Sequence, residues 1–390
     1  GVRTITIDED VTVTTSLIVD AQPVADFDGD LTISTALTNN GLIQVAQAFN
    51  APAIAIGGEV EYNGTGAQSV DTDITSFNDL TNNNTNVAGL QATAALVVNG
   101  DLDNNQLLDC NANLSVTGGS STFSNTGGTL RFAGTTFTCD DDATIEGTVI
   151  FDGTGESFVG NGTAVSFAAL EFDNTGVRTI GFSEDVTVTS SLTVAAQPTA
   201  DFNGDLTINA NSISNGGLVT IAHDLINGSG GGISFDGAVT FDGGVTSNIN
   251  TNAFSFSGTV TNADGIASSE NLTFTGTFDN DGLADLSGNL TLNGGSSVFD
   301  NAGGTLNYSG TNFTCADDAT IEGTVVFDGT AETFTGNGTT VSFSTLEFDN
   351  TGVRTITIDE DVTVTTSLIV DAQPVADFDG DLTISTALTN

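Results

Sequence analysis

The segment NLTFTGTFDNDGLADLSGNLTLNGG, residues 271–295, decides the fold. Its motif LTFTG, which begins at Leu272, returns as LTLNG at Leu290. In a β-strand the first and third residues of such a motif lie on one face, and glycine is typical of turns. The segment therefore predicts short strands, each with one apolar face, that are closed by glycine turns.

The same hydrophobic-x-hydrophobic-x-glycine pattern continues through the chain. Its glycines follow one another at similar intervals, and they are Gly100, Gly118, Gly134 and Gly153 in the first half and Gly237, Gly258, Gly276, Gly294, Gly310 and Gly329 in the second. A recurrence of about 18 residues is typical of one coil of a β-solenoid, in which each coil buries its apolar face against its neighbours. We therefore expect an all-β protein, a β-solenoid rod with coils of roughly 18 residues and about 21 coils in total.

A longer repeat divides the chain into units. Residues 1–39 recur without a change as residues 352–390, and a looser copy begins at Gly176. We predict a first solenoid repeat unit at 1–175, a second at 176–351 and the start of a third at 352–390. If this 351-residue period continues, the sequence Asn-Gly-Leu-Ile-Gln-Val of residues 40–45 is expected to follow Asn390.

Tandem β-sandwich domains are the alternative architecture. VEYNGTGAQSV from Val60 is echoed by VIFDGTGESFV from Val149, and this 89-residue offset suits an immunoglobulin-sized module. The solenoid is preferred because a sandwich does not explain a recurrence of about 18 residues that continues through a whole unit.

The charge of the chain excludes several functions. The 390 residues include 50 Asp and Glu against 4 Lys and Arg, all of them arginine, which gives a formal net charge of -46. Such a polyanion is repelled by nucleic acids and by anionic membranes, so neither is an expected partner. The absence of lysine excludes a P-loop, and no apolar run is long enough to insert into a membrane.

Nothing in the sequence predicts a catalytic or cofactor-binding residue. His223 is the one histidine, and the matching stretch of the first half has none. An enzyme of the polysaccharide lyase or hydrolase class would need a groove of clustered Asp, Arg or Lys, and three of the four arginines occupy one repeat position in separate units. We therefore expect a protein that is not an enzyme.

The acidic clusters have two interpretations. Charge that keeps neighbouring rods apart is one, and specific calcium sites are the other, because stacked carboxylates repel unless cations lie between them. The calcium candidates are Asp26, Asp28 and Asp30 in one cluster and Asp140, Asp141 and Asp142 in another.

The three cysteines also leave two interpretations open. Cys139 and Cys315 occupy the same position in successive units, too many coils apart for a disulfide within one chain, and Cys110 makes the count odd. Cys139 and Cys315 each lie two residues after a phenylalanine, Phe137 or Phe313, and therefore on the same face of the predicted strand as that phenylalanine. They are interpreted as buried core thiols, with lateral disulfides between chains as the alternative.

Two segments carry a resemblance to known proteins. EYNGTGAQSVDTDITSFNDLTNNN (61–84) and FDGTGESFVGNGTAVSFAALEFDN (151–174) resemble repeats of giant secreted bacterial surface proteins, the filamentous-haemagglutinin-like or Bacteroidetes-type adhesin β-helix arrays. The resemblance implies a non-enzymatic rod at the bacterial cell surface, outside the cell.

These observations together predict a structural protein. We expect a segment of a long extracellular filament or adhesin stalk, whose partners are further copies of the same repeat and neighbouring rods that associate laterally. A carbohydrate- or ice-binding adhesin is the alternative, because threonine is dense at outward positions such as Thr4, Thr6, Thr12 and Thr14.

Overall fold

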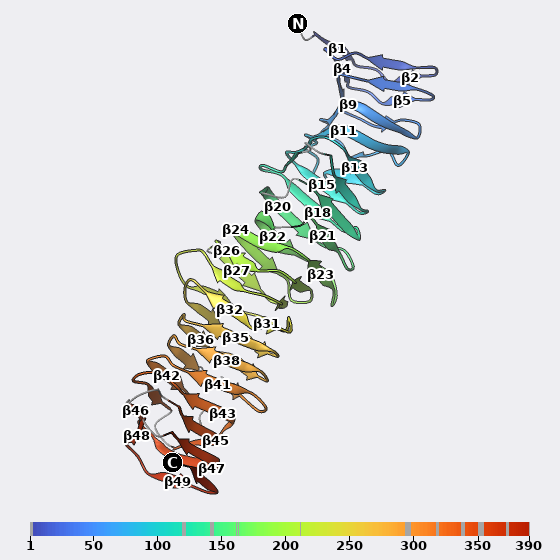
Figure 1. Ribbon diagram of the computed structural model, residues 1–390. Helices are drawn as coiled ribbons and strands as arrows, with labels where there is room; N and C mark the ends of the chain where they lie inside the picture. Colours follow the sequence, from blue (N-terminus) through green and yellow to red (C-terminus); the bar gives the residue numbers. More distant parts are fainter. Residues whose placement is uncertain are drawn as a thin grey trace. The chain divides into compact units, whose positions relative to one another are not determined.

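The computed structural model describes residues 3–118, 122–140, 144–160, 162, 164–210, 212–292, 298–316, 320–336, 340–349, 355–371 and 374–389. Every regular element among these residues is a β-strand, and the strands stack in parallel as a β-solenoid of about 18 turns (Figure 1). The chain forms two compact units, Gly1–Pro198 and Thr199–Asn390. The predicted β-solenoid is confirmed.

The first unit contains the strands β1 to β24. They are β1 Arg3–Ile7, β2 Val11–Val13, β3 Leu17–Val19, β4 Pro23–Phe27, β5 Leu31–Ile33, β6 Leu37–Asn39, β7 Leu42–Val45, β8 Phe49–Asn50, β9 Ile54–Tyr62, β10 Gln68–Ser69, β11 Ile74–Asn82, β12 Leu90–Ala92, β13 Leu96–Val98, β14 Leu102–Asn104, β15 Leu107–Cys110, β16 Leu114–Val116, β17 Phe123–Ser124, β18 Thr129–Phe132, β19 Thr136–Cys139, β20 Ile145–Phe151, β21 Ser157–Val159, β22 Ala164–Phe172, β23 Thr179–Phe182 and β24 Asp185–Val194.

The second unit contains the strands β25 to β50. They are β25 Thr199–Phe202, β26 Leu206–Ile208, β27 Ser212–Asn215, β28 Leu218–Ile221, β29 Leu225–Asn227, β30 Ile233–Phe235, β31 Ala238–Phe241, β32 Ser247–Asn250, β33 Phe254–Phe256, β34 Val260–Asn262, β35 Gly265–Ser268, β36 Leu272–Phe274, β37 Thr277–Asn280, β38 Leu283–Leu286, β39 Leu290–Leu292, β40 Val298–Asp300, β41 Thr305–Tyr308, β42 Asn312–Cys315, β43 Ile321–Phe327, β44 Thr333–Thr335, β45 Thr340–Phe348, β46 Thr355–Ile358, β47 Asp361–Val370, β48 Val375–Phe378, β49 Leu382–Ile384 and β50 Ala387–Thr389.

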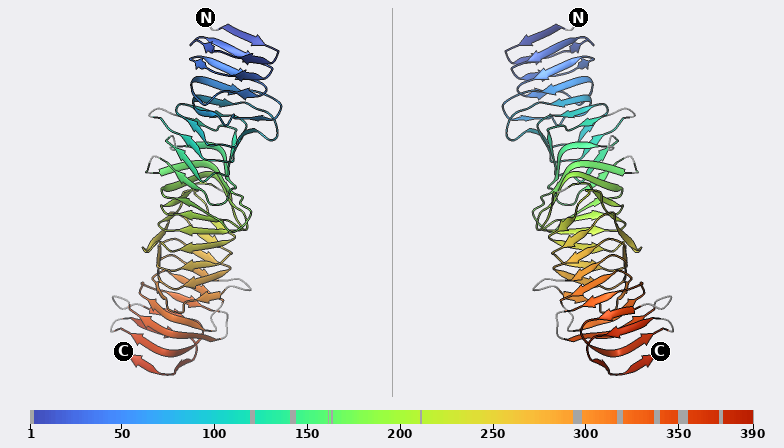
Figure 2. Two further views of the ribbon diagram at one scale, coloured as in Figure 1. Left: turned by 90° about the vertical axis from the view of Figure 1, so that its right-hand side faces the viewer. Right: turned by 90° about the vertical axis from the view of Figure 1, so that its left-hand side faces the viewer.

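A regular coil consists of three strands, each in a different sheet. In the second unit β36, β37 and β38 form one coil, and β39, β40 and β41 form the next. Each strand pairs in parallel with its counterpart one coil later, as in β36 with β39, β37 with β40 and β38 with β41. Figure 2 shows the strands of successive coils lying side by side within each unit.

Alternation of apolar and polar residues sets the two faces of each strand. Val186, Val188, Leu192 and Val194 of β24 are buried, whereas the threonines between them reach the surface. The predicted strands with one core face are therefore confirmed in this copy of the repeat.

The coil length varies more than the sequence predicted. Leu272 pairs with Leu290 across a coil of the predicted length. The coil from Ile43 to its partner Val60 is shorter, and the coil from Phe158 to its partner Phe182 is much longer. The 18-residue value holds around β33, β36 and β39 and is too short for most other coils, so the predicted count of about 21 coils is too high.

The predicted coil length is too short because the hydrophobic-x-hydrophobic-x-glycine motif occurs in more than one strand of a coil, each strand lying in a different sheet. The motif LTLNG at 290–294 begins with β39, whereas LNYSG at 306–310 belongs to β41 of another sheet. The true partner of β39 is β42, in which Phe313 lies opposite Leu290. The spacing between successive motifs was therefore shorter than a coil.

The core of the second unit contains a ladder of phenylalanine rings. Phe274 lies between Phe256 and Leu292 in neighbouring coils, as its sequence spacing predicted, and it is fully buried. Ring centroids lie 5.2 Å apart between Phe256 and Phe274, 4.4 Å between Phe274 and Phe278, and 5.6 Å between Phe278 and Phe299. This stacking explains why the chain needs so many phenylalanines.

The corner glycines are required by close approach of neighbouring coils. A Cβ atom on Gly276 would lie 2.2 Å from the carbonyl oxygen of Gly258, and a Cβ on Gly258 would lie 2.1 Å from that of Gly237. Both distances are far below van der Waals contact, so a side chain at this corner would force the coils apart.

Buried asparagines form a second kind of ladder in each unit. In the second unit Nδ2 of Asn262 donates to Oδ1 of Asn280, and Nδ2 of Asn280 donates to Oδ1 of Asn301, both at 2.6 Å. The first unit has the same arrangement, with Asn82, Asn104 and Asn125 linked at 2.7 Å. All six side chains are fully buried, so these ladders hold adjacent coils in register.

The sandwich alternative is wrong. The strands pair in parallel throughout the described residues, and VEYNGTGAQSV and VIFDGTGESFV belong to coils of one continuous stack in the first unit. The boundary between the compact units falls at residue 198. The predicted boundary at 175 marks where the sequence of the repeat restarts. The two positions differ because a sequence repeat can begin at any point of a coil.

Candidate functional site

The strongest polar feature is an acidic ladder in the second unit, formed by Asp328, Asp349 and Asp371. Each residue directly follows a long strand, β43, β45 or β47. Asp349 donates its backbone N–H to the carbonyl of Phe327 at 3.0 Å, and Asp371 donates to that of Phe348 at 3.1 Å. These bonds place the three carboxyl groups above one another, one coil apart.

The stacking raises the pKa of carboxyl groups in and beside this ladder. A hydrogen bond with Asp371 raises the pKa of Asp349, and burial and repulsion by Asp371 raise it further. Burial, with repulsion by Asp285 and Asp349, raises the pKa of Asp328. Burial and the carboxylates of Asp349 and Asp371 likewise raise the pKa of Glu347. The ladder thus favours protons or cations, since a hydrogen bond between two carboxyl groups needs a proton on one of them.

The first unit carries a modified version of this ladder. Asp152 and Asp173 occupy the positions that Asp328 and Asp349 occupy in the next repeat of the sequence. Here Arg131 lies beside the ladder, and its Nε is 3.3 Å from Oδ2 of Asp152.

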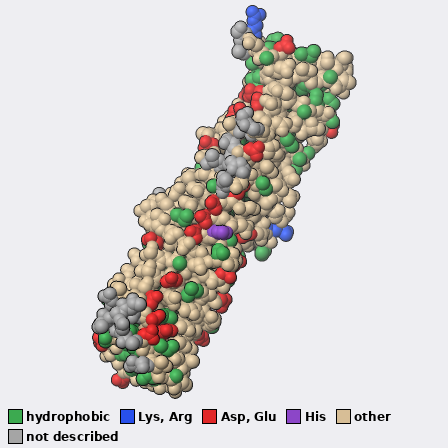
Figure 3. Space-filling model, viewed as in Figure 1, with side chains coloured by type: hydrophobic (Ala, Val, Ile, Leu, Met, Phe, Trp, Pro, Cys, Tyr) green, Lys and Arg blue, Asp and Glu red, His purple; other side chains and the backbone are tan. Residues whose placement is uncertain are grey.

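Burial nevertheless dominates the environment of Asp152. It raises the pKa of Asp152 to about 6 against the opposing effect of Arg131, with further increases from Asp109, Glu156 and Asp173. The ion pair with Arg131 therefore does not neutralise the carboxylates of this ladder. Figure 3 shows acidic side chains scattered in small groups over the visible face.

In the first predicted calcium cluster, Asp26 and Asp30 accept hydrogen bonds from the chain itself. Oδ2 of Asp26 accepts from the hydroxyl of Thr6 at 3.1 Å, Oδ1 of Asp30 accepts from the N–H of Ala48 at 3.1 Å, and Asp28 is exposed. Among the described residues, no three His, Cys, Asp or Glu side chains lie close enough to hold a metal ion.

The second predicted calcium cluster is described only in part. Oδ2 of Asp140 accepts from the N–H of Gly118 at 3.2 Å, and Asp141 and Asp142 lie outside the described residues. Specific calcium binding stays a prediction for both clusters.

A column of hydroxyl groups runs along one sheet of the second unit. Six outward side chains of successive strands lie in register, and they are Ser234, Ser255, Thr273, Thr291, Thr314 and Thr335. Beside it Oδ1 of Asn271 accepts from the N–H of Asn289 at 3.0 Å, and Oδ1 of Asn289 accepts from that of Asn312 at 3.1 Å. On this sheet a hydroxyl group is kept at the same outward position over six coils.

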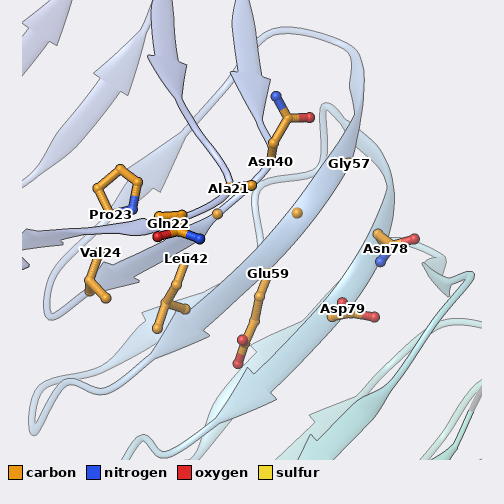
Figure 4. A pocket seen from close by; sticks show the side chains of 12 residues that line it. Ala21, Gln22, Pro23, Val24, Asn40, Leu42, Gly57, Glu59, Asn78 and Asp79 are labelled. Carbon is orange, nitrogen blue, oxygen red and sulfur yellow. The ribbon is translucent and has the colours of Figure 1, made fainter. Parts of the chain in front are cut away.

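A surface pocket of about 500 Å³ lies in the first unit (Figure 4). Its carboxylates belong to Glu59 and Asp79, which project from β9 and β11. Oε1 of Glu59 accepts from the hydroxyl of Thr81 at 2.8 Å, and Oδ1 of Asp79 accepts from the N–H of Asp101 at 2.9 Å. Both groups support the coil, and the pocket presents no nucleophile paired with a base.

The cysteines lie in the core and His223 lies outside it. Cys110, Cys139 and Cys315 are fully buried, which confirms the interpretation as core thiols and leaves a lateral disulfide no exposed sulfur. Burial also raises the pKa of the Cys110 thiol, so it stays protonated and unreactive. His223 is an exposed residue of the turn after β28.

Comparisons with known proteins add no relative. No protein-family model matches the chain, and no match to it was found among curated proteins or solved structures. The described residues contain no helix that could cross a membrane.

Proposed function

We propose that this chain is a structural segment of a long extracellular filament or adhesin stalk, with mechanical extension and coverage of a cell surface as its role and no catalysis. One observation carries the proposal. The described residues of the identical sequences 1–39 and 352–390 pair in the same registers at two points of the chain, although the counterparts of β2 and β3 are joined in one strand, β47. Thr4 lies opposite Val24 in the first copy, and Thr355 lies opposite Val375 in the last.

Side-chain contacts are repeated along with the strands. Oδ1 of Asp10 accepts from the N–H of Asp30 at 2.9 Å, and Oδ1 of Asp361 accepts from that of Asp381 at 2.7 Å. A unit that restarts in the register of its predecessor can be repeated without a change of geometry, so length grows with the number of repeats. Additive length is the property that a stalk requires.

The acidic surface fits the same role. Adjacent rods of net negative charge repel each other at short range, which keeps filaments soluble and separate. Apart from the buried asparagine ladders, inward positions are mostly apolar while outward ones carry Asp, Thr, Ser and Asn, so the surface can change without loss of the core.

Appending residues 40–390 after residue 390 tests the proposal. At about 21 residues and about 4.8 Å per coil, this 351-residue addition should lengthen the particle by about 80 Å. Small-angle scattering and electron microscopy measure the increase. As a control, an addition that starts ten residues later breaks the coil register and should produce a bend or a bead. A particle that does not lengthen with the in-register addition would refute the proposal.

The hydroxyl column supports a second candidate, a carbohydrate- or ice-binding adhesin. Regularly spaced hydroxyl groups on a β-sheet can match a repeating ligand surface, and here they are one coil apart over six coils. Replacing Thr273 and Thr291 by Val removes two hydroxyls and keeps the shape. Reduced glycan-array or ice-affinity binding would support this candidate, provided that Thr240→Val on another sheet has no effect. If the unmodified chain binds neither glycans nor ice, this second candidate function is excluded.

A further inference from the structure

We propose that a hollow on the outward face of β30, β33 and β36 binds a neutral oligosaccharide. Its volume is about 310 Å³, and the residues that line it include three with hydroxyl groups, Ser234, Ser255 and Thr273, and two small ones, Gly232 and Ala253. The inference rests on the second candidate function, the carbohydrate-binding adhesin, and it names the place where the ligand binds and the chemical class of that ligand.

The hollow lies where a column of asparagines ends. Beside the hydroxyl column, three successive coils carry an asparagine at the same place, each hydrogen-bonded to the next, and they are Asn271, Asn289 and Asn312. In the two coils before them this place is occupied by Ala253, which precedes Phe254, and by Gly232, which precedes Ile233. Two asparagine side chains are therefore missing from the column, and their absence leaves the space that the hollow occupies.

The floor of the hollow carries hydroxyl groups in register. Ser234 lies opposite Ser255, and Ser255 lies opposite Thr273, so the three hydroxyl groups follow one another at the coil spacing of about 4.8 Å. None of them takes part in a hydrogen bond with another residue that the structure describes. They are therefore available to a ligand that carries several hydroxyl groups of its own.

The hollow is uncharged in a strongly acidic chain. None of the described residues that line it is Asp, Glu, Arg or His, although 50 of the 390 residues are Asp or Glu. Atoms of Gly232, Ile233, Ala253 and Phe254 make the rest of the lining apolar. A sugar ring matches this combination, because it presents C–H groups on its face and hydroxyl groups at its edge. Acidic sugars are disfavoured by the negative field of the chain.

The direction of the hollow favours a sugar chain over a peptide. It crosses three neighbouring strands, whereas a peptide that added a strand to the sheet would run along β30 alone. Among the described residues this sheet begins with β30, so the hollow is open at that end. A second hollow of about 180 Å³ shares Gly232, Ile233 and Ser234 with the first and continues toward Ile213. The two together accommodate a short chain of sugars.

Hydrogen bonds fix the wall of the hollow before a ligand binds. The carbonyl oxygen of Ala253 accepts from the N–H of Ile233 at 3.2 Å and from Nδ2 of Asn227 at 3.1 Å. Asn227 is fully buried, and its own carbonyl oxygen accepts from Nδ2 of Asn252 at 3.0 Å. A wall that is already held in place loses little conformational entropy on binding, which favours affinity.

An array of neutral, sialylated and sulfated oligosaccharides, probed with the full chain, tests the proposal. The chain should bind neutral oligosaccharides and not the acidic ones, and biolayer interferometry with the best neutral one measures affinity. Ala253→Asn extends the asparagine column into the hollow, so it should weaken binding about tenfold without lowering the melting temperature. Thr273→Val keeps the shape and removes one hydroxyl group, so it should weaken binding about fivefold. The matched control is Thr314→Val in the same hydroxyl column outside the hollow, which should bind like the wild type.

The other outcomes separate this site from carbohydrate binding as a whole. If the chain binds glycans but Ala253→Asn and Thr273→Val bind like the wild type, the hollow is not the site, and the adhesin candidate survives without it. Equal loss with Thr314→Val would show that the whole column binds, and a preference for sialylated or sulfated oligosaccharides would show that the ligand is not neutral; either result overturns the proposal. A chain that binds no oligosaccharide would overturn it together with carbohydrate binding as a candidate function, and the stalk proposal would stand.

Discussion

Replacing Asn280 by alanine should open the solenoid locally at a large free-energy cost. Asn280 is fully buried and takes part in three hydrogen bonds. Its Nδ2 donates to Oδ1 of Asn301 and to the carbonyl of Thr305, and its Oδ1 accepts from Nδ2 of Asn262. Nδ2 of Asn262 keeps a second acceptor, the carbonyl of Leu283 at 3.2 Å.

The expected magnitude follows from the groups that lose their partner. Two acceptors, on Asn301 and Thr305, lose a donor in a buried site, at about 1–3 kcal/mol each. The smaller side chain also leaves a cavity, so we expect a total of about 3–5 kcal/mol. Asn280→Asp keeps the volume but removes the donor, and it should be at least as destabilising because it adds a buried charge. The control is Asn271→Ala, an exposed asparagine with one bond, which should cost less than about 1 kcal/mol.

Hydrogen exchange read by mass spectrometry measures both the size and the extent of the effect. Each coil contacts only its neighbours, so protection should fall around β34, β37 and β40 and persist in distant coils. A loss for Asn280→Ala no larger than for Asn271→Ala would refute the view that the ladder holds the coils in register. A uniform loss over the whole unit would refute the local character of the stack.

The remaining predictions concern the corner glycine Gly276, the titration of Asp152 and the binding of calcium. Gly276→Ala should lower the melting temperature, because its Cβ would meet the carbonyl of Gly258, whereas Gly231→Ala should be neutral since no atom lies within 4 Å of a Cβ there; equal effects would contradict the steric argument. Folding raises the pKa of Asp152 to about 6, so it favours the protonated carboxyl; the stability that this group contributes should therefore be lost as pH rises through about 6 and regained as pH falls. Asp152→Asn should reduce this pH dependence in thermal melts at pH 5 and 7, and an unchanged slope would speak against it. If carboxylates bind calcium specifically, chelation at low ionic strength should lower the melting temperature, and calcium should restore it better than sodium at equal ionic strength; equal rescue would leave only diffuse screening.

The fold could be predicted from the sequence because its inward faces follow one simple rule. Any apolar residue of suitable size fits a coil that is covered by similar coils, so alternation identified the strands, and the 18-residue spacing identified the stacking partners of Phe274. The exact duplication of 1–39 then established that the stack repeats.

The full extent of the surface columns and buried ladders could not be predicted in this way, because it depends on the register of coils whose length differs from 18 residues. Asp328 and Asp349 are separated along the chain by more than the predicted coil length, and so are Asn280 and Asn301. A coil of the predicted length would therefore have aligned neither pair. Asparagine is also uncommon in strands and is typical of turns, so its buried positions carried no recognisable signal.

Turn length therefore controls the chemistry of the surface more than it controls the core. Adding or removing residues at a turn leaves apolar residues facing inward as long as strand parity is kept, so the core tolerates both the short coil from Ile43 to Val60 and the long one from Phe158 to Phe182. The outward columns are less tolerant, since each needs its residue type at the same place in every coil. The hydroxyl column keeps its register from Ser234 to Thr335 although the coils between them vary in length. On another sheet the threonines at 220, 240 and 261 give way to Asp279 and Asp300. A column preserved across unequal coils is thus the feature in which a binding role would be found, whereas the apolar alternation is required by the fold alone.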